Sequence, residues 1–168
     1  MNKIIGFLSI FVLLILQIAF LPHFPIFYVF PNILLAAIIA FAIIRGGRWV
    51  FVFALFSGLA LDIFSNHAFG IYALDFVLLA WLIQFIGKNI FKAADFFGQI
   101  SILACACVIY SFLNLFLIKI FYWLGLGQNI SFWINFLRVG LLEIILNLIL
   151  AVLGLAILKK VYGLFAGI

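Results

Sequence analysis

The sequence predicts an all-α integral membrane protein, a six-transmembrane-helix bundle with both termini on the cytoplasmic side. Of its 168 residues 71% are hydrophobic and only 8% are charged, far below the roughly 25% usual for a soluble domain. The hydrophobic residues divide into six stretches. Basic residues cluster at four points that flank these stretches: Lys3, Arg45 with Arg48, Lys88 with Lys92, and Lys159 with Lys160.

The orientation follows from where the basic residues are absent. With a cytoplasmic N-terminus, all four basic points fall on the inner side, whereas the outer loops at 22–31, 65–69 and 123–133 contain no Lys or Arg. The positive-inside rule predicts this asymmetry. The net charge of +5 is therefore explained by topology and by contact with anionic lipids, and we exclude nucleic acid as a partner.

Each hydrophobic stretch is expected to be one helix, because a lipid-exposed backbone must satisfy its own hydrogen bonds and no two-residue alternation indicates a barrel. The first stretch is longer than a signal-peptide core and is followed by no small-residue cleavage site, so we expect it to be retained. The expected spans, within one polytopic domain (1–168), are residues 4–21, 31–44, 49–64, 69–87, 97–118 and 135–158.

The second and third spans are short. They have 14 and 16 residues, against the roughly 20 that a crossing needs, so they either draw in flanking residues or lie inside the bundle. The sequence Arg45-Gly46-Gly47-Arg48 predicts a tight turn that joins them as an antiparallel hairpin. All loops are too short for a soluble catalytic domain. Aromatic residues in the first and third outer loops are typical of the membrane interface.

Polar residues within or beside the spans are the candidate functional positions, since a buried charge in a bilayer must face protein, water or headgroups. For Lys119 we expect snorkelling to the interface. Arg138 either snorkels or pairs with an acidic residue. Glu143 and Asn147 lie one helical turn apart and predict a polar seam, although a proton-carrying Glu143 stays an alternative. The candidates are Asp75, Lys119, Arg138, Glu143 and Asn147.

A stripe of small residues crosses the third span. Ala54, Gly58 and Asp62 recur every four residues, which places them on one helix face and allows close approach of another backbone. Asp62 either caps the N-terminus of the fourth span or faces a partner. The chain offers no nucleophile with a nearby base and no cluster with metal-ligand spacing, so we expect no enzyme, metal or cofactor.

Residues 31–80 resemble the rod-shape-determining protein MreD family. The resemblance rests on Pro31-Asn32 at the start of the second span, on Gly58-Leu59-Ala60-Leu61-Asp62 at the end of the third, and on Gly70-Ile71-Tyr72-Ala73 at the start of the fourth. It implies helix-packing or partner roles for Pro31, Asn32, Gly58, Asp62 and Gly70, and the small-residue stripe adds Ala54 to these candidates.

The resemblance implies a non-enzymatic, multi-pass protein of the bacterial cytoplasmic membrane. Such a protein would scaffold MreC and thereby lateral peptidoglycan synthesis by RodA and its class B penicillin-binding partner. The resemblance also implies a fold like that of the substrate-binding subunits of energy-coupling-factor transporters, so a vitamin-type binding subunit is the alternative. Those subunits dock through Ala-x-x-x-Ala in the first helix, whereas here Ala36 and Ala40 place that pattern in the second span.

Overall fold

The computed structural model describes residues 12–20, 29–89, 96–127 and 129–166 and forms an all-helical bundle, with no strand in these ranges. The elements in chain order are a short helix that ends in the π-helical turn η1 (Leu16–Phe20), α2 (Ile33–Ile44), α3 (Arg48–Phe64), α4 (Ile71–Asn89), α5 (Phe96–Trp123), α6 (Phe132–Asn135), η3 (Phe136–Gly140) and α7 (Leu141–Ala166). The expectation of an all-α bundle is thus confirmed.

Among the described residues, three helices are long and apolar enough to cross a membrane: Ile71–Asn89, Phe97–Trp123 and Phe132–Lys160. The last of these joins α6, η3 and α7 into one rod with a π-helical segment in its first third. Of the first expected span, residues 4–11 and 21 lie outside the described residues, so that span is seen only from 12 to 20.

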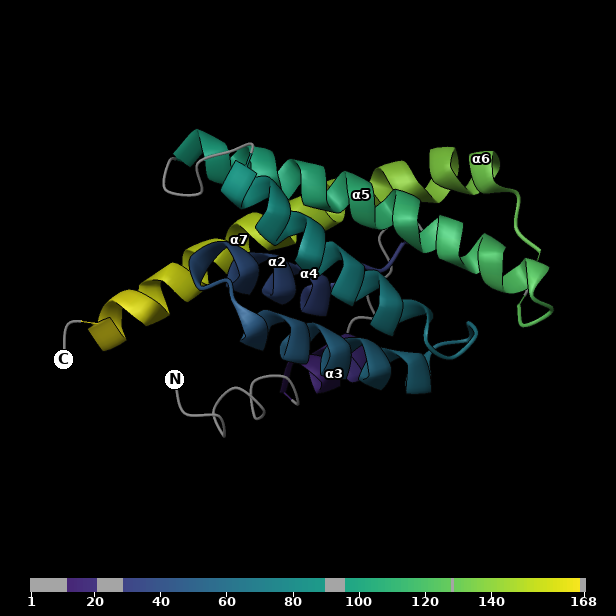
Figure 1. Cartoon of the computed structure of the whole chain (residues 1–168), viewed down its shortest axis with the longest axis horizontal. Coiled ribbons are helices and arrows are strands. Elements are labelled where there is room, and N and C mark those ends of the chain that lie inside the picture. Colours follow the sequence, from purple (N-terminus) through teal and green to yellow (C-terminus); the bar gives the residue numbers. More distant parts are fainter. Residues whose placement is uncertain (1–11, 21–28, 90–95, 128, 167–168) are drawn as a thin grey trace.

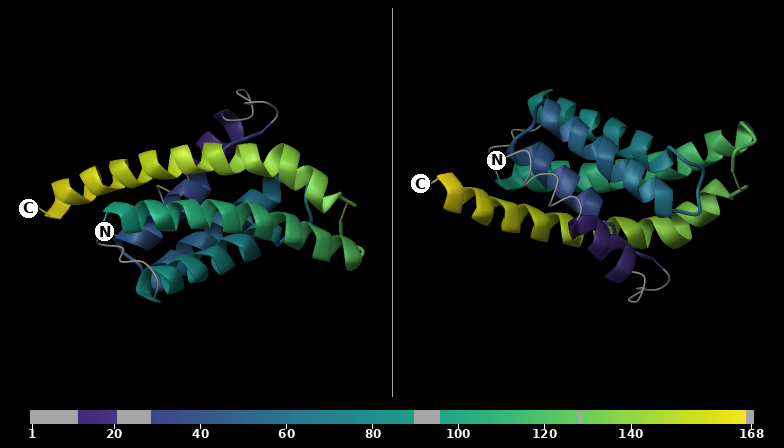
Figure 2. Two further views of the ribbon diagram at one scale, coloured as in Figure 1. Left: turned by 90° about the horizontal axis from the view of Figure 1, so that it is seen from above. Right: turned by 90° about the horizontal axis from the view of Figure 1, so that it is seen from below.

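Helix α2 is the centre of the bundle (Figures 1 and 2). Its 12 residues reach about 18 Å at 1.5 Å per residue, too short to cross a bilayer alone. Eight of them are buried, because α2 packs mainly against α7 and α4 and also touches α3 and α5. Of the two arrangements expected for this short span, the structure shows the one inside the bundle.

The Arg45–Arg48 turn joins α2 to α3, and both of its glycines have positive φ, 58° at Gly46 and 78° at Gly47. The turn is held from α4 by Gln84, whose side-chain oxygen accepts the Gly47 N–H at 2.8 Å. The main partner of α3 is nevertheless α4, with which it forms the most extensive helix pair of the bundle.

The basic helix ends gather at one end of the bundle. The α2–α3 turn, the C-terminal end of α4 and the C-terminal part of α7 all lie on this side (Figure 1), and with them Arg45, Arg48, Lys88, Lys159 and Lys160. Arg45 and Lys88 line one shallow pocket here. Lys159 of α7 donates a hydrogen bond to Gln99 of α5. The opposite end carries the α3–α4 and α5–α6 loops.

Candidate functional site

A network of buried amides joins three helices near the start of α2. The Asn32 side chain caps α2 by accepting the Leu35 N–H at 3.0 Å, and its Nδ2 donates to the Tyr110 hydroxyl of α5 at 3.2 Å. The Asn32 N–H donates to Asn147 Oδ1 of α7 at 2.7 Å. All three residues are at least 95% buried, so these bonds fix the positions of α2, α5 and α7 relative to each other.

Gln17 holds the segment that leads into α2. Its Oε1 accepts the Ile33 N–H at 2.7 Å, and its Nε2 donates to the Pro31 carbonyl at 3.2 Å. The Gln17 amide thus satisfies one backbone N–H and one backbone carbonyl at the start of α2. This contact also places Pro31 beside the first helix.

Two carboxylates face polar groups of α5. The Ser111 hydroxyl lies 2.7 Å from Glu143 Oε2 and 3.3 Å from the Gly140 carbonyl. Because a hydroxyl has one proton, the shorter contact with Glu143 is the main bond. Asp75 of α4 is fully buried and accepts from Asn114 Nδ2 at 3.0 Å, while its other oxygen has no hydrogen-bond partner among the described residues.

The α3–α4 hairpin is braced by Asp62. Its Oδ1 accepts the Tyr72 N–H at 2.9 Å and its Oδ2 accepts the Ala73 N–H at 3.0 Å. Both donors are in the first turn of α4, where N–H groups lack helical partners and where the helix dipole favours an anion. The structure therefore places Asp62 in the capping position, not at a partner-facing surface.

The small-residue stripe is used within the chain. Ala54, Gly58 and Asp62 are all buried, and a Cβ added to Gly58 would lie 2.4 Å from Ala73 Cα and 2.6 Å from the Tyr72 carbonyl oxygen. This close approach lets Asp62 reach the α4 backbone. Gly70, immediately before α4, has φ of +102°, a conformation that glycine adopts without strain.

Lys119 is held by the α5–α6 loop. Its Nζ donates to Asn129 Oδ1 at 2.8 Å and to the Ile130 carbonyl at 3.3 Å, and it lies 5.1 Å from the Tyr122 ring centroid. Snorkelling alone therefore does not describe Lys119, because its ammonium group organises a loop. Arg138 is exposed and makes no ion pair with any acidic residue in the described ranges.

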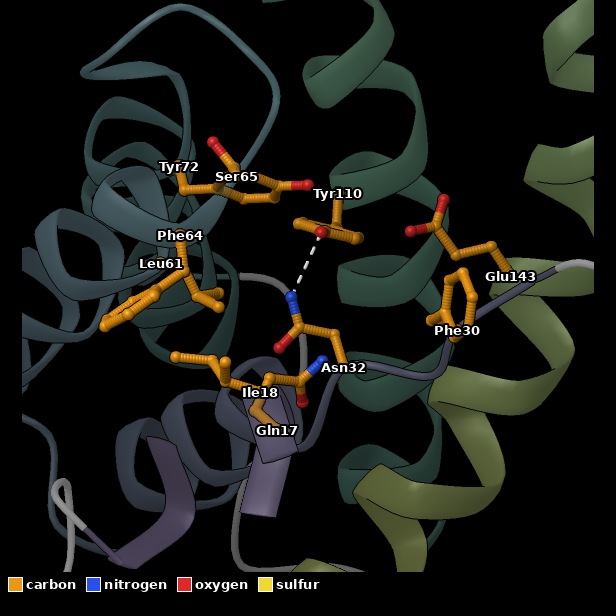
Figure 3. A pocket seen from close by; sticks show the side chains of 10 residues that line it. All are labelled: Gln17, Ile18, Phe30, Asn32, Leu61, Phe64, Ser65, Tyr72, Tyr110 and Glu143. Atoms are coloured by element: carbon orange, nitrogen blue, oxygen red, sulfur yellow. Dashed lines mark hydrogen bonds between the residues drawn. The ribbon is translucent and has the colours of Figure 1, made fainter. Parts of the chain in front are cut away.

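A cavity of about 280 Å³ lies between these helices (Figure 3). Its lining includes residues beside the start of α2, the end of α3 and the start of α4, which lie at the end of the bundle opposite the basic residues. Asn32 and Tyr110 lie at its centre, with Glu143 and Phe30 on one side and Tyr72, Leu61 and Phe64 on the other. Gln17, Ile18 and Ser65 complete the lining. Of the candidates Asp62, Asp75, Arg138 and Glu143, all within the described residues, Glu143 alone lines this cavity.

His67 lies in the loop between α3 and α4, with its ring centroid 6.1 Å from that of Tyr72. Burial lowers the pKa of His67 below its ordinary value of 6.5, and the Asp62 carboxylate partly offsets this. Within the described residues, no three His, Cys, Asp or Glu side chains could hold a metal ion. Cys105 and Cys107 are both free thiols.

Sequence reasoning missed four residues that complete the site, Gln17, Tyr110, Ser111 and Asn114, and it included Tyr72 only as part of the Gly70–Ala73 motif. A signal for three of them exists. Tyr110, Ser111 and Asn114 are a group of polar side chains within an otherwise apolar stretch, and in a membrane helix such a group indicates a face turned toward protein.

Comparisons with known proteins leave the family of this chain open. No protein-family model matches it, and neither a curated protein nor a solved structure matches it.

Proposed function

We propose that this chain is a non-enzymatic scaffold of the bacterial cell-elongation machinery in the cytoplasmic membrane. In this proposal it crosses the membrane six times with both termini inside, in a fold like that of the transporter substrate-binding subunits. It binds an MreC-like periplasmic scaffold and through it supports RodA and the class B penicillin-binding protein.

One observation carries this proposal: the residues of the MreD-like pattern work as one structural unit. Asn32 caps α2, Gly58 and Asp62 fix α3 against α4, and Gly70 opens α4. Asn32, Leu61 and Tyr72 line the same cavity. A pattern spread over about 40 residues thus determines one end of the bundle, which is the periplasmic end if the basic end faces the cytoplasm.

The orientation is tested by labelling single cysteines placed at His67 and at Lys88 in the background Cys105→Ser and Cys107→Ser. A membrane-impermeant maleimide added to intact cells should label position 67 and spare position 88. Labelling of position 88 from outside, or of 67 only after the cells are opened, contradicts the orientation and the partner proposal built on it.

The partner is tested by photocrosslinking in the native host. Leu78 of α4 is 40% exposed, whereas its neighbour Leu79 is fully buried, so the two positions form a matched pair. Exposed crosslinking residues introduced at Leu78 on α4, Phe116 on α5 and Ile149 on α7 sample three faces of the bundle. An MreC-like protein should be captured from at least one of these and not from Leu79. If no MreC-like protein is captured from any of the three exposed positions and none co-purifies with the chain, the scaffold proposal is contradicted.

The cavity favours a second candidate, a small-molecule binding subunit of a vitamin-type transporter. A concave site with few convergent polar groups is the usual form of a ligand pocket. Against it, the Ala36-x-x-x-Ala40 pair is buried in the bundle, and Ala36 faces Gly154 of α7, so this pair does not offer a docking surface. Specific, stoichiometric stabilisation of the purified protein by a vitamin in a thermal-shift screen favours transport over scaffolding.

A further inference from the structure

The cavity combines a carboxylate with aromatic rings. Phe30, Phe64, Tyr72 and Tyr110 contribute four aromatic side chains to its lining, and Glu143 contributes the one acidic side chain. Figure 3 shows the Glu143 carboxylate above the Phe30 ring and beside Tyr110. These residues come from the segment before α2 and from α3, α4, α5 and α7, so the folded bundle is needed to assemble them.

The Glu143 carboxylate has no cationic partner within the described part of the chain. One oxygen accepts the Ser111 hydroxyl, and no Lys or Arg of the described ranges lines the cavity. Lys119 binds the α5–α6 loop instead. Arg138 is on the same rod as Glu143 but is exposed and outside the lining. A partly buried carboxylate in a membrane protein is stabilised when a cationic group faces it.

Acidic side chains lie on and near the lining of the cavity. The carboxylates of Glu143, Asp75 and Asp62 all lie within electrostatic range of Tyr72, which lines it. The chain as a whole carries a net charge of +5, yet these three acids converge at the end opposite the basic residues. In a low-dielectric surrounding such a convergence attracts a cation more strongly than the same charges do in water.

The aromatic rings select the kind of cation. Ring faces attract ammonium groups through the ring quadrupole. The described acids do not form a metal cluster, and four rings with one carboxylate suit a cation that carries apolar substituents. The volume of about 280 Å³ is at the lower end of ligand pockets, so it accommodates a small molecule or the headgroup of a larger one.

We propose that this cavity binds a small organic ammonium group, with Glu143 as its counter-ion and with Phe30, Phe64, Tyr72 and Tyr110 around its apolar part. The ammonium group comes from a soluble amine or from the headgroup of an aminophospholipid. The proposal rests on the cavity alone and holds for a scaffold or a transporter subunit, so its failure leaves the crosslinking and labelling tests above unaffected.

The test uses the purified full-length chain, delipidated in an uncharged maltoside detergent, with choline as the probe. Its uncharged isostere 3,3-dimethylbutan-1-ol has the same shape and serves as the charge control. Isothermal titration should show choline binding at least about tenfold tighter than the isostere. Glu143→Gln should remove most of this difference, whereas Arg138→Gln, which also changes the charge of the same rod by one, should not weaken choline binding.

Phe30→Leu provides a second variant in case Glu143→Gln does not fold. It keeps the carboxylate and removes one ring, so choline binding should weaken about threefold while binding of the isostere stays unchanged. Equal effects on both probes contradict the proposed role of the ring.

Native mass spectrometry distinguishes the two sources. The chain extracted from membranes is compared for retention of phosphatidylethanolamine and of phosphatidylglycerol, in wild type and in Glu143→Gln. Selective, Glu143-dependent retention of phosphatidylethanolamine assigns the site to a lipid headgroup, and its absence alongside choline binding assigns it to a soluble amine. If choline binds no better than the isostere and neither lipid is selected, the ammonium site is refuted.

Discussion

Gly58 and Ala73 bring the backbones of α3 and α4 into direct contact: a Cβ atom added to Gly58 would lie 2.4 Å from Ala73 Cα. Real Cβ atoms do not approach a backbone atom this closely, and the backbone cannot move aside as a flexible side chain can. The contact therefore sets the distance between the two helices, and through it the position of the Asp62 cap.

Gly58→Ala should therefore destabilise the protein, although alanine normally favours a helix over glycine by about 1 kcal/mol. The added methyl group must separate α3 from α4, and overpacking of this kind costs roughly 1–3 kcal/mol or more. Gly87→Ala in α4 is the matched control, because its Cβ would lie 3.7 Å from the Ile102 side chain, an ordinary contact. Thermal unfolding in detergent should show a lower midpoint for Gly58→Ala only, and equal midpoints contradict the close approach.

Asp62→Ala should loosen the first turn of α4. The substitution leaves the Tyr72 and Ala73 N–H groups without their carboxylate acceptors, and loss of a helix cap costs about 0.5–2 kcal/mol. Asp62→Asn keeps one acceptor oxygen and should have a smaller effect. Amide hydrogen exchange measured by mass spectrometry should be faster at residues 71–74 in Asp62→Ala than in wild type. Unchanged exchange there, with exchange altered elsewhere, means that Asp62 has another role.

The sequence predicts contacts between residues that are close in the chain, such as the Asp62 cap, better than the long-range contacts that form the cavity. The cap is local: Asp62 and Tyr72 are 10 residues apart across one short turn, so periodicity and turn residues are enough to suggest it. The Asn32–Asn147 bond joins residues 115 apart, and one sequence contains no signal for that pairing. The cavity depends on such pairings, so only its Asn32 and Glu143 were among the candidates.

Element boundaries show the same limit. Helix α5 ends at Trp123, whereas the sequence predicted an end at residue 118. The aromatic residues Phe121, Tyr122 and Trp123 are typical of the interface, but they are still helical here, since composition identifies a membrane depth and not a backbone conformation. The π-helical segment Phe136–Gly140 was likewise not expected, because no residue type specifies it.

The titration of His67 tests the geometry of the α3–α4 loop. Burial lowers its pKa and the Asp62 carboxylate raises it, so Asp62→Asn should lower the pKa of His67 further. Nuclear magnetic resonance of labelled imidazole measures this directly.

With a folded pKa below 6.5, folding favours the neutral ring, and the contribution of His67 to stability is present above pH 6.5 and is lost as the pH falls through the folded pKa. The effect on unfolding should be small because the ring is only partly buried and solvent screens it. An unchanged pKa of His67 in Asp62→Asn means that the carboxylate does not act on the ring.

Substitutions of Asn32 test whether the amide network or the helix cap matters more. Asn32→Ala removes both the acceptor for Leu35 N–H and the donor to Tyr110. It leaves a buried tyrosine hydroxyl without its partner, so we expect a loss of roughly 2–3 kcal/mol from the cap and the unsatisfied group together. Asn32→Asp keeps the acceptor for Leu35, and the Tyr110 hydroxyl can rotate to donate to the new carboxylate.

Asn32→Asp should therefore lower the unfolding midpoint less than Asn32→Ala. Its remaining cost comes from a second negative charge in the cavity beside Glu143, since like charges in a low-dielectric site repel. Adding Glu143→Gln to Asn32→Asp should recover stability, and adding it to Asn32→Ala should not. If Glu143→Gln changes both variants equally, the two side chains do not share one cavity in the folded protein. If Asn32→Asp is as unstable as Asn32→Ala, the donor to Tyr110 is the essential contact and the cap is secondary.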